Sequence, residues 1–166
     1  MTEKILCLTR GGKSSYPNQD WAIALAKESD AHLRFLYITN VHFLDYTAAP
    51  IVFDIEAELD EMGEFLLVMA QERAQNAGVE AEATVRRGEF RQVLEQVISE
   101  FDVDTVIMGS SAEDTGIVSY DYSIALTEDI SFKTGVEFII LQEGEVFYTA
   151  RSRDQPEDEE SEYLQQ

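Results

Sequence analysis

Two short loops contain the residue types that bind anions. The first is Arg10–Ser15 (RGGKSS) and the second is Gly109–Gly116 (GSSAEDTG). Glycine and serine before a helix can present backbone N–H groups to a phosphate, and the lysine of the first loop would add positive charge. Arg10 is the expected partner of a bound anion. The candidate ligand-binding residues are Arg10, Gly11, Gly12, Lys13, Ser14, Gly109, Ser110, Ser111 and Ser123.

The first loop departs from the phosphate-binding motifs of nucleotide enzymes. A Walker A motif needs glycine where Cys7 stands. The loop of ATP pyrophosphatases (Ser-Gly-Gly-X-Asp-Ser) needs serine and aspartate where Arg10 and Ser14 stand. In the second loop, Glu113 and Asp114 would repel a phosphate. The alternative interpretation is therefore that both loops simply join a strand to a helix.

Other reactive residue types favour structural roles. Cys7 lies in an apolar run, where a thiol usually acts as a small hydrophobic side chain. With one cysteine and two histidines, the sequence predicts no metal site, and no residue is predicted to be catalytic. Arg86, Arg87 and Arg91 could receive an anion, but pairing with nearby acidic side chains is the favoured interpretation.

The charge of the chain limits its partners. Thirty-three acidic and 12 basic residues give a formal net charge of −21. A field of this sign repels phosphate backbones and anionic lipids, so we expect neither a nucleic-acid nor a membrane partner. The sequence has no apolar run of the ~18 residues that a membrane span requires, and its start does not resemble a signal peptide. We therefore expect a cytoplasmic protein.

Strand and helix patterns alternate along the chain. Apolar runs predict buried strands, and residues 80–85 alternate like an edge strand. Three- and four-residue apolar spacing predicts helices, the longest of them at 55–76. The segment 39–54 has no clear period and is predicted to be a long connection. The predicted strands are 4–9, 33–38, 80–85, 105–108 and 136–141, and the predicted helices are 18–29, 55–76, 90–101 and 119–132.

This order predicts an α/β fold, a three-layer α/β/α sandwich around a parallel sheet. Ligands of such sheets bind beyond the carboxyl ends of the strands, where the strand order reverses, and both candidate loops lie there. We divide the chain into a domain at 1–142, a segment at 143–153 and an acidic disordered tail at 154–166. Within the second part, Glu145–Ala150 is predicted to form an additional strand or a dimer arm.

Two stretches resemble the universal stress protein family. KILCLTRGG (4–12) is similar to its first strand and loop, and VRRGEFRQVLEQVISEFDVDTVIMGSS (85–111) to its strand-turn-helix-strand core ending in Met-Gly-Ser. The resemblance covers roughly residues 3–142. It implies a five-stranded parallel sheet in the order 3-2-1-4-5 and a homodimer paired through the last core strand, Val136–Leu141.

The nucleotide motif of that family is incomplete in this chain. ATP-binding members carry aspartate at the position of Arg10, and a Gly-X2-Gly-X9-Gly motif followed by a hydroxyl residue. Gly109 and Ser123 fit this motif, whereas Ala112 and Tyr122 replace its second and third glycines. Glycine at such positions lets the backbone approach a phosphate closely, and a tyrosine ring would fill that space.

We therefore interpret the chain as a non-catalytic universal stress protein. It would act in a stress response as a homodimer, through protein association or a non-standard ligand, and without a cofactor. The alternative is an adenine-nucleotide-binding protein or an ATP-hydrolysing enzyme that holds ATP or AMP at residues 11–15.

Overall fold

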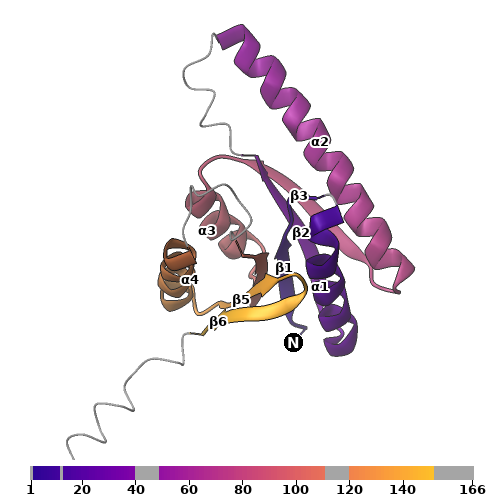
Figure 1. Cartoon of the computed structure of the whole chain (residues 1–166), viewed down its shortest axis with the longest axis vertical. Helices are drawn as coiled ribbons and strands as arrows, with labels where there is room; N and C mark the ends of the chain where they lie inside the picture. Colours follow the sequence, from indigo (N-terminus) through magenta and orange to yellow (C-terminus); the bar gives the residue numbers. More distant parts are fainter. Residues whose placement is uncertain (1, 12, 40–48, 111–119, 152–166) are drawn as a thin grey trace, which may run out of the picture.

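The computed structural model describes residues 2–11, 13–39, 49–110 and 120–151 of the chain. A six-stranded sheet lies at its centre in the order β3-β2-β1-β4-β5-β6 (Figure 1). The first five strands are parallel and β6 is antiparallel to β5. The strands are β1 (Lys4–Leu8), β2 (His32–Thr39), β3 (Ala81–Arg87), β4 (Thr105–Gly109), β5 (Glu137–Gln142) and β6 (Glu145–Ala150). The predicted order of the five parallel strands and the additional strand are confirmed.

Two helices cover each face of the sheet. α1 (Tyr16–Ser29) and α2 (Ala49–Asn76) pack on one side, and α3 (Phe90–Glu100) and α4 (Tyr120–Thr134) pack on the other. Strands buried on both faces need apolar residues at successive positions. β1 meets this requirement, since Ile5, Leu6 and Cys7 are all at most 1% exposed. The predicted three-layer class is therefore confirmed.

Two helices begin earlier than predicted. α2 begins at Ala49, inside the predicted connection 39–54, and α1 begins at Tyr16 rather than at residue 18. The sequence shows no clear period over residues 39–54 as a whole, although Val52 lies at helical spacing from Ile55 and Leu59, so the prediction began the helix too late. Within the connection, residues 40–48 are outside the described part of the chain, as is the predicted acidic tail.

A tight turn places β6 beside β5. Glu143 and Gly144 both have positive φ angles, 51° and 82°. This is the conformation of a two-residue hairpin turn that suits the twist of antiparallel strands. Strand β5 consequently has β4 on one side and β6 on the other, and β6 forms the outer edge.

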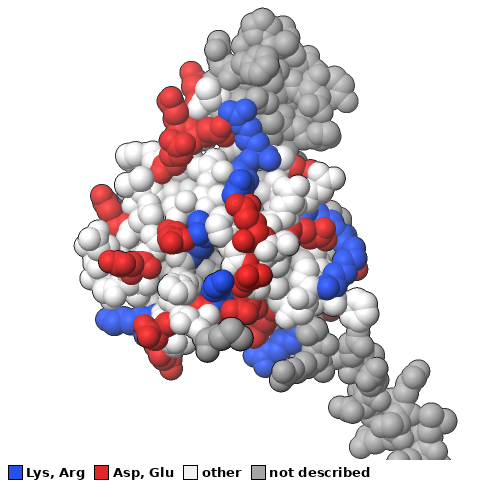
Figure 2. Space-filling view, turned by 180° about the vertical axis from the view of Figure 1, so that it is seen from behind, with Lys and Arg blue, Asp and Glu red and all other residues white. Residues whose placement is uncertain are grey.

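Charged side chains are scattered over the face of the molecule that Figure 2 shows. Acidic and basic side chains lie next to one another near the centre of this face. The predicted pairing of the arginines is confirmed, because Arg86 binds Glu100 through two contacts of 2.8 and 3.0 Å. Arg87 Nε lies 2.7 Å from an oxygen of Asp60. None of the helices in the described part of the chain is long and apolar enough to cross a membrane.

Candidate functional site

The two predicted loops meet at one end of the sheet. β1 and β4 are adjacent and parallel, with Cys7 opposite Ile107, so both strands end at the same edge. Arg10 and Gly11 follow β1, and Gly109 closes β4. This is the point where the strand order reverses, as the sequence predicted.

The other predicted residues are more scattered. Lys13 and Ser14 lie in a short 3-10 turn, η1 (Lys13–Ser15), and are exposed to solvent. Ser123 is buried within α4. Gly12 and Ser111 are outside the described residues. The assignment of these residues to a ligand remains a prediction.

The backbone of the first loop is hydrogen-bonded within the chain. The Gly11 N–H donates to the Thr9 hydroxyl oxygen (3.1 Å), and the Ser15 hydroxyl donates to the Gly11 carbonyl oxygen (2.9 Å). The buried Gln19 amide also donates to Thr9 Oγ1 (2.8 Å). An anion at this loop would need backbone N–H groups. At Gly11 that group already has a partner.

A helix from a distant part of the sequence packs on the same loop. Gly11 has a φ of +75°, and a Cβ atom placed on it would lie 2.6–2.7 Å from three side-chain atoms of Leu66. Leu66 belongs to the middle of α2. Real Cβ atoms do not approach other atoms this closely, so Leu66 occupies the space where a side chain at position 11 would project. α2 therefore closes this side of the loop.

The end of β4 is filled in a similar way. The Ser110 N–H donates to the Leu141 carbonyl oxygen (2.7 Å). The side chain of Asn18 lies against Gly109, where its nitrogen would be 3.0 Å from an added Cβ. Its oxygen accepts a hydrogen bond from the Gly144 N–H (2.9 Å). Asn18 thus links the start of α1, the end of β4 and the β5–β6 turn.

The buried side chain of Gln19 lies beside the first loop. Gln19 is 1% exposed, and among the described residues its side-chain oxygen has no hydrogen-bond donor. A carbonyl oxygen is an acceptor, so it suits an O–H or N–H group rather than a phosphate. The free group therefore does not complete an anion site.

The titratable groups whose pKa is shifted have structural roles. Burial raises the pKa of the Cys7 thiol to about 12, which keeps it protonated at neutral pH. A hydrogen bond between Arg91 and Asp129 lowers the pKa of Asp129 and raises the pKa of Arg91. Both results agree with the interpretation of these residues as core and surface-pair residues.

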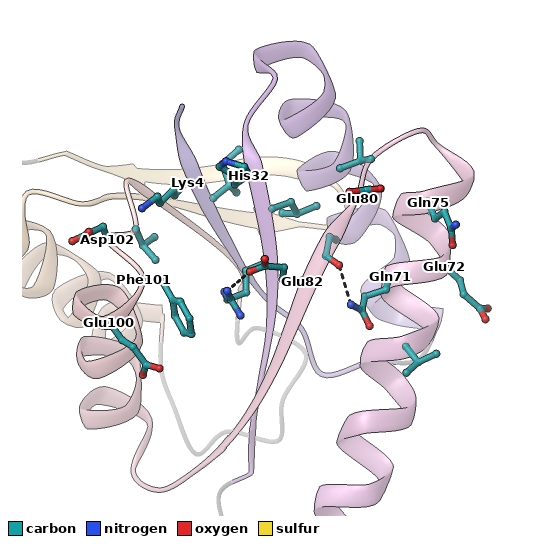
Figure 3. A pocket seen from close by; sticks show the side chains of 17 residues that line it. Lys4, His32, Gln71, Glu72, Gln75, Glu80, Glu82, Glu100, Phe101 and Asp102 are labelled. Carbon is teal, nitrogen blue, oxygen red and sulfur yellow. Dashed lines mark hydrogen bonds and ion pairs between the residues drawn. The ribbon is translucent and has the colours of Figure 1, made fainter. Parts of the chain in front are cut away.

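A cavity lies at the opposite end of the sheet. It has a volume of about 880 Å³ and opens around the amino ends of β1, β2 and β3 (Figure 3). Figure 3 shows lining residues of α2, among them Gln71 and Glu72, on one side of β3. Phe101 and Asp102, which follow α3, lie on the other side. The cavity therefore includes both flanks of an edge strand.

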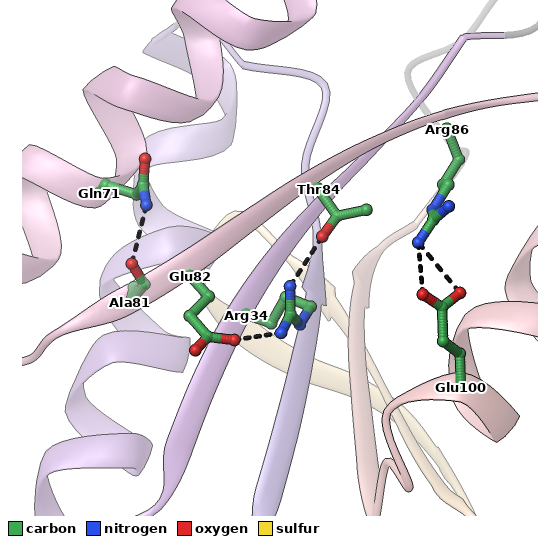
Figure 4. Close-up of polar contacts among 7 residues, drawn as sticks. All are labelled: Arg34, Gln71, Ala81, Glu82, Thr84, Arg86 and Glu100. Carbon is green, nitrogen blue, oxygen red and sulfur yellow. Dashed lines mark hydrogen bonds and ion pairs between the residues drawn. The ribbon is translucent and has the colours of Figure 1, made fainter.

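Polar contacts hold the side chains at this end in place (Figure 4). The guanidinium of Arg34 lies over the Phe101 ring, 3.6 Å from its centroid. The same guanidinium pairs with Glu82 and donates to the Thr84 hydroxyl (2.8 Å). Contacts with the Phe101 ring and the Glu82 carboxylate hold the Arg34 guanidinium in one position. This part of the cavity wall therefore has a defined shape.

Sequence reasoning missed both the closure of the first end and the cavity at the second. Asn18 and Gly144 are 126 positions apart, and Leu66 is far from Gly11 in the chain. No spacing in one sequence reports such contacts. The signal available in the sequence was glycine at positions 11 and 144, because glycine before a helix or in a turn often has the positive φ that both residues adopt.

Comparison with known proteins identifies the family. A model of the universal stress protein family matches residues 1–117. Among curated proteins, none matches the chain. Solved structures of the family share its fold, and we report three of them.

A universal stress family protein from Burkholderia pseudomallei is 18% identical, with 84% of this chain and 95% of that chain covered and a TM-score of 0.63. The universal stress protein UspA from Lactobacillus plantarum is 12% identical, with 84% and 97% covered and a TM-score of 0.65. A family protein from Arabidopsis thaliana, solved with AMP bound, is 17% identical, with 94% and 97% covered and a TM-score of 0.53. The chain belongs to the universal stress protein family.

Proposed function

We propose that this chain is a non-catalytic universal stress protein that acts in a stress response through association with other proteins. It works in the cytoplasm as a homodimer and does not use an adenine nucleotide. The observation that carries the proposal is the closed loop after β1. There the Gly11 N–H is bonded to Thr9, and Leu66 packs against the glycine.

The AMP-bound relative from Arabidopsis thaliana can be compared with this chain. That protein holds AMP on the same fold. In this chain, Arg10 stands where ATP-binding members carry aspartate, and the amides of Gly11 and Ser110 donate within the chain. A nucleotide bound at these loops would have to displace the hydrogen bonds of the Gly11 and Ser110 amides, and it would meet Arg10 in place of the aspartate. The remaining candidate ligand is an anion held by Arg10 and Lys13 at the exposed outer side of the loop.

Thermal unfolding with and without ATP, ADP and AMP at fixed salt tests the proposal. A ligand at ~100 times its dissociation constant would stabilise the fold by ~2.7 kcal/mol, which is several degrees for this size. We expect no shift with any of the three. A clear shift would support the alternative, an adenine-nucleotide-binding protein that uses residues 11–15, and ATP hydrolysis would then be measured.

The homodimer contact is best placed on β6. The sequence-based proposal used Val136–Leu141, but β6 pairs along that strand, so the outer edge of the sheet is β6. Val146 is 51% exposed and Phe147 is 43% exposed on this strand. An edge strand with apolar side chains is a template for pairing with a second copy.

Light scattering coupled to gel filtration tests the dimer. We expect a dimer for the native chain and a monomer for Val146→Glu. The matched control is Met62→Glu, which places the same charge at a residue that is 47% exposed on α2. A monomeric native chain, or a dimer unaffected by Val146→Glu, would contradict this contact.

A further inference from the structure

We propose that the outer face of α2 binds an amphipathic helix of a partner protein. The bound helix packs its apolar side chains on three apolar residues of α2, and its lysine or arginine side chains pair with glutamates on the same face. We call this surface the α2 outer face, and it consists of Glu58, Glu61, Met62, Phe65, Met69 and Glu72. The inference rests on the proposed function, association with other proteins, and it names the surface and the kind of partner.

α2 has apolar residues on two opposite sides. Leu67, Ala70 and Ala74 are at most 2% exposed and belong to the core beneath the helix, whereas Phe65 is 64% and Met62 47% exposed. Phe65 precedes Leu67 by two positions, about 200° around a helix, so it projects away from the core. Figure 1 shows α2 along the outer side of the molecule. A surface helix normally has polar residues on that side, so the exposed apolar residues indicate a binding surface.

The spacing of these residues indicates that the partner is a helix. Met62, Phe65 and Met69 are separated by three and four positions, and Glu58 and Glu72 continue this alternation on either side. This is the spacing of a coiled-coil seam, against which the side chains of a second helix pack. The side chains of a strand repeat every two residues, so a strand would not follow this seam.

Unpaired carboxylates flank the apolar residues. Glu58, Glu61 and Glu72 are exposed, and in the described part of the chain none of them forms an ion pair. Figure 3 shows the Glu72 side chain pointing away from β3. Arg73 is the one basic residue of α2, and it already pairs with Asp20 of α1. Lysine or arginine beside the apolar side chains of the bound helix therefore complements this face.

The same charge argues against a second copy as the occupant. α2 carries seven acidic residues and one basic residue. In a parallel pair of α2 helices Glu58 would face its own counterpart, and in an antiparallel pair centred on Phe65 it would face Glu72. Like charges brought together at an interface oppose binding. A separate protein with a basic helix is therefore the occupant that the face favours.

The proposed dimer contact leaves this face open. α2 packs on β2 and β3, at one end of the strand order, and β6 lies at the other end. A dimer paired through β6 would thus carry two α2 outer faces, one on each copy. Partner binding and dimer formation can therefore be measured separately.

The length of the face sets the length of the bound helix. Fourteen steps along α2 separate Glu58 from Glu72, which is about 21 Å at ~1.5 Å per residue. A bound helix of about 15 residues covers this length. Helices this short are marginal alone in water, so a test peptide has to be somewhat longer and rich in strong helix formers.

A fluorescently labelled synthetic peptide of about three Leu-Ala-Ala-Leu-Lys-Ala-Lys repeats tests this surface by anisotropy. The repeat places leucine at the seam spacing and lysine beside it. We expect saturable binding to the full chain at about 0.15 M salt. The control peptide has the same composition with its leucines spread over all sides of the helix, and it should bind more weakly by about tenfold or more. This control separates packing on the seam from the attraction of any cationic peptide to a chain of net charge −21.

A pair of matched variants tests the apolar residues. Phe65→Ser should weaken binding of the repeat peptide by about tenfold. Phe132→Ser is the control, because Phe132 on α4 is 65% exposed against 64% for Phe65 and lies on the other side of the sheet. This control variant should bind the peptide normally.

A second pair tests the carboxylates. Glu61→Lys and Glu28→Lys change the net charge equally, and both positions are exposed on helices. Glu61→Lys should weaken binding by about tenfold, whereas Glu28→Lys on α1 should change it by less than about twofold. If Phe65→Ser proves unfolded by circular dichroism, this second pair decides.

Four results would overturn the proposal. They are no saturable binding below about 1 mM, equal binding of the two peptides, equal effects within either variant pair, and conversion of a dimer to a monomer by Phe65→Ser, which would place a second copy on the face. The thermal shift with nucleotides is measured on the same protein. Absent peptide binding without a nucleotide shift removes only this surface, whereas a nucleotide shift removes the proposed function.

Discussion

The two ends of the sheet differ in how far the chain satisfies its own groups. At the carboxyl ends of β1 and β4, Thr9, Asn18 and Leu66 take up the backbone groups and the space that a ligand would use. At the amino ends of β1, β2 and β3, a cavity of about 880 Å³ opens beside β3, which among the described residues has only β2 as a neighbouring strand. The comparison shows that the chain itself can close the position where α/β sheets usually bind ligands, while another surface stays open.

The closure depends on a contact between segments far apart in the chain. α2 is anchored along β3 by the Gln71–Ala81 and Asp60–Arg87 contacts. The same helix brings Leu66 against Gly11. One element thus blocks the first end and forms one wall of the cavity at the second, through Val68, Gln71, Glu72 and Gln75. The comparison can therefore be tested by changing either end separately.

The largest expected effect is at Gly11. Gly11→Ala places a Cβ at a φ of +75° and 2.6–2.7 Å from Leu66, so it should destabilise the fold by about 2–4 kcal/mol through backbone strain and overpacking. Urea unfolding measures the change. The control is Gly135→Ala, at a φ of +78° with nothing within 4 Å of its Cβ, which carries the strain alone. Equal losses in both variants would show that Leu66 does not close the loop.

A smaller effect is expected at the β5–β6 turn. Gly144→Ala meets the Cβ of Pro17 at 3.0 Å and has a φ of +82°. We expect a loss of about 1–3 kcal/mol in urea unfolding, because the strained turn also presses on the start of α1. Gly135→Ala again serves as the reference. A loss no larger than that of the reference would mean that the turn does not pack against α1.

The smallest effect concerns an ion pair away from both ends. Arg91 lowers the pKa of Asp129 in the folded state. A carboxyl with a lowered folded pKa stabilises the protein above its unfolded pKa of about 3.9, and this stabilisation disappears as the pH falls through the folded pKa. Asp129→Asn should therefore lower the melting temperature slightly at pH 7, and the difference should vanish in acid. A difference that persists below the folded pKa would contradict this assignment.

The sequence predicted the layers and strand order because these follow from local patterns and from the family resemblance. Apolar runs such as residues 4–8 must be buried on both faces, which fixes a parallel sheet covered by helices. The start of α2 at Ala49 was missed because the continuous apolar run at residues 51–53 hides the helical spacing from Val52 to Ile55. Local patterns thus report burial well and the ends of elements poorly.

The sequence predicted where the candidate site lies, but not that other parts of the chain close it. Gly11 and Gly109 do lie at the point where the strand order reverses. Their packing against Leu66 and Asn18 joins residues from separate elements, which no spacing encodes. The cavity escaped for the same reason, since its lining comes from strands and helices across residues 4–103.

One NMR experiment tests the closure of the first end most directly. A ¹⁵N-labelled chain is titrated with AMP, and the backbone amide shifts are followed. Our account predicts that AMP leaves the Gly11, Gly109 and Ser110 amides unmoved. Saturable shifts of the Gly11 and Gly109 amides with AMP would contradict it.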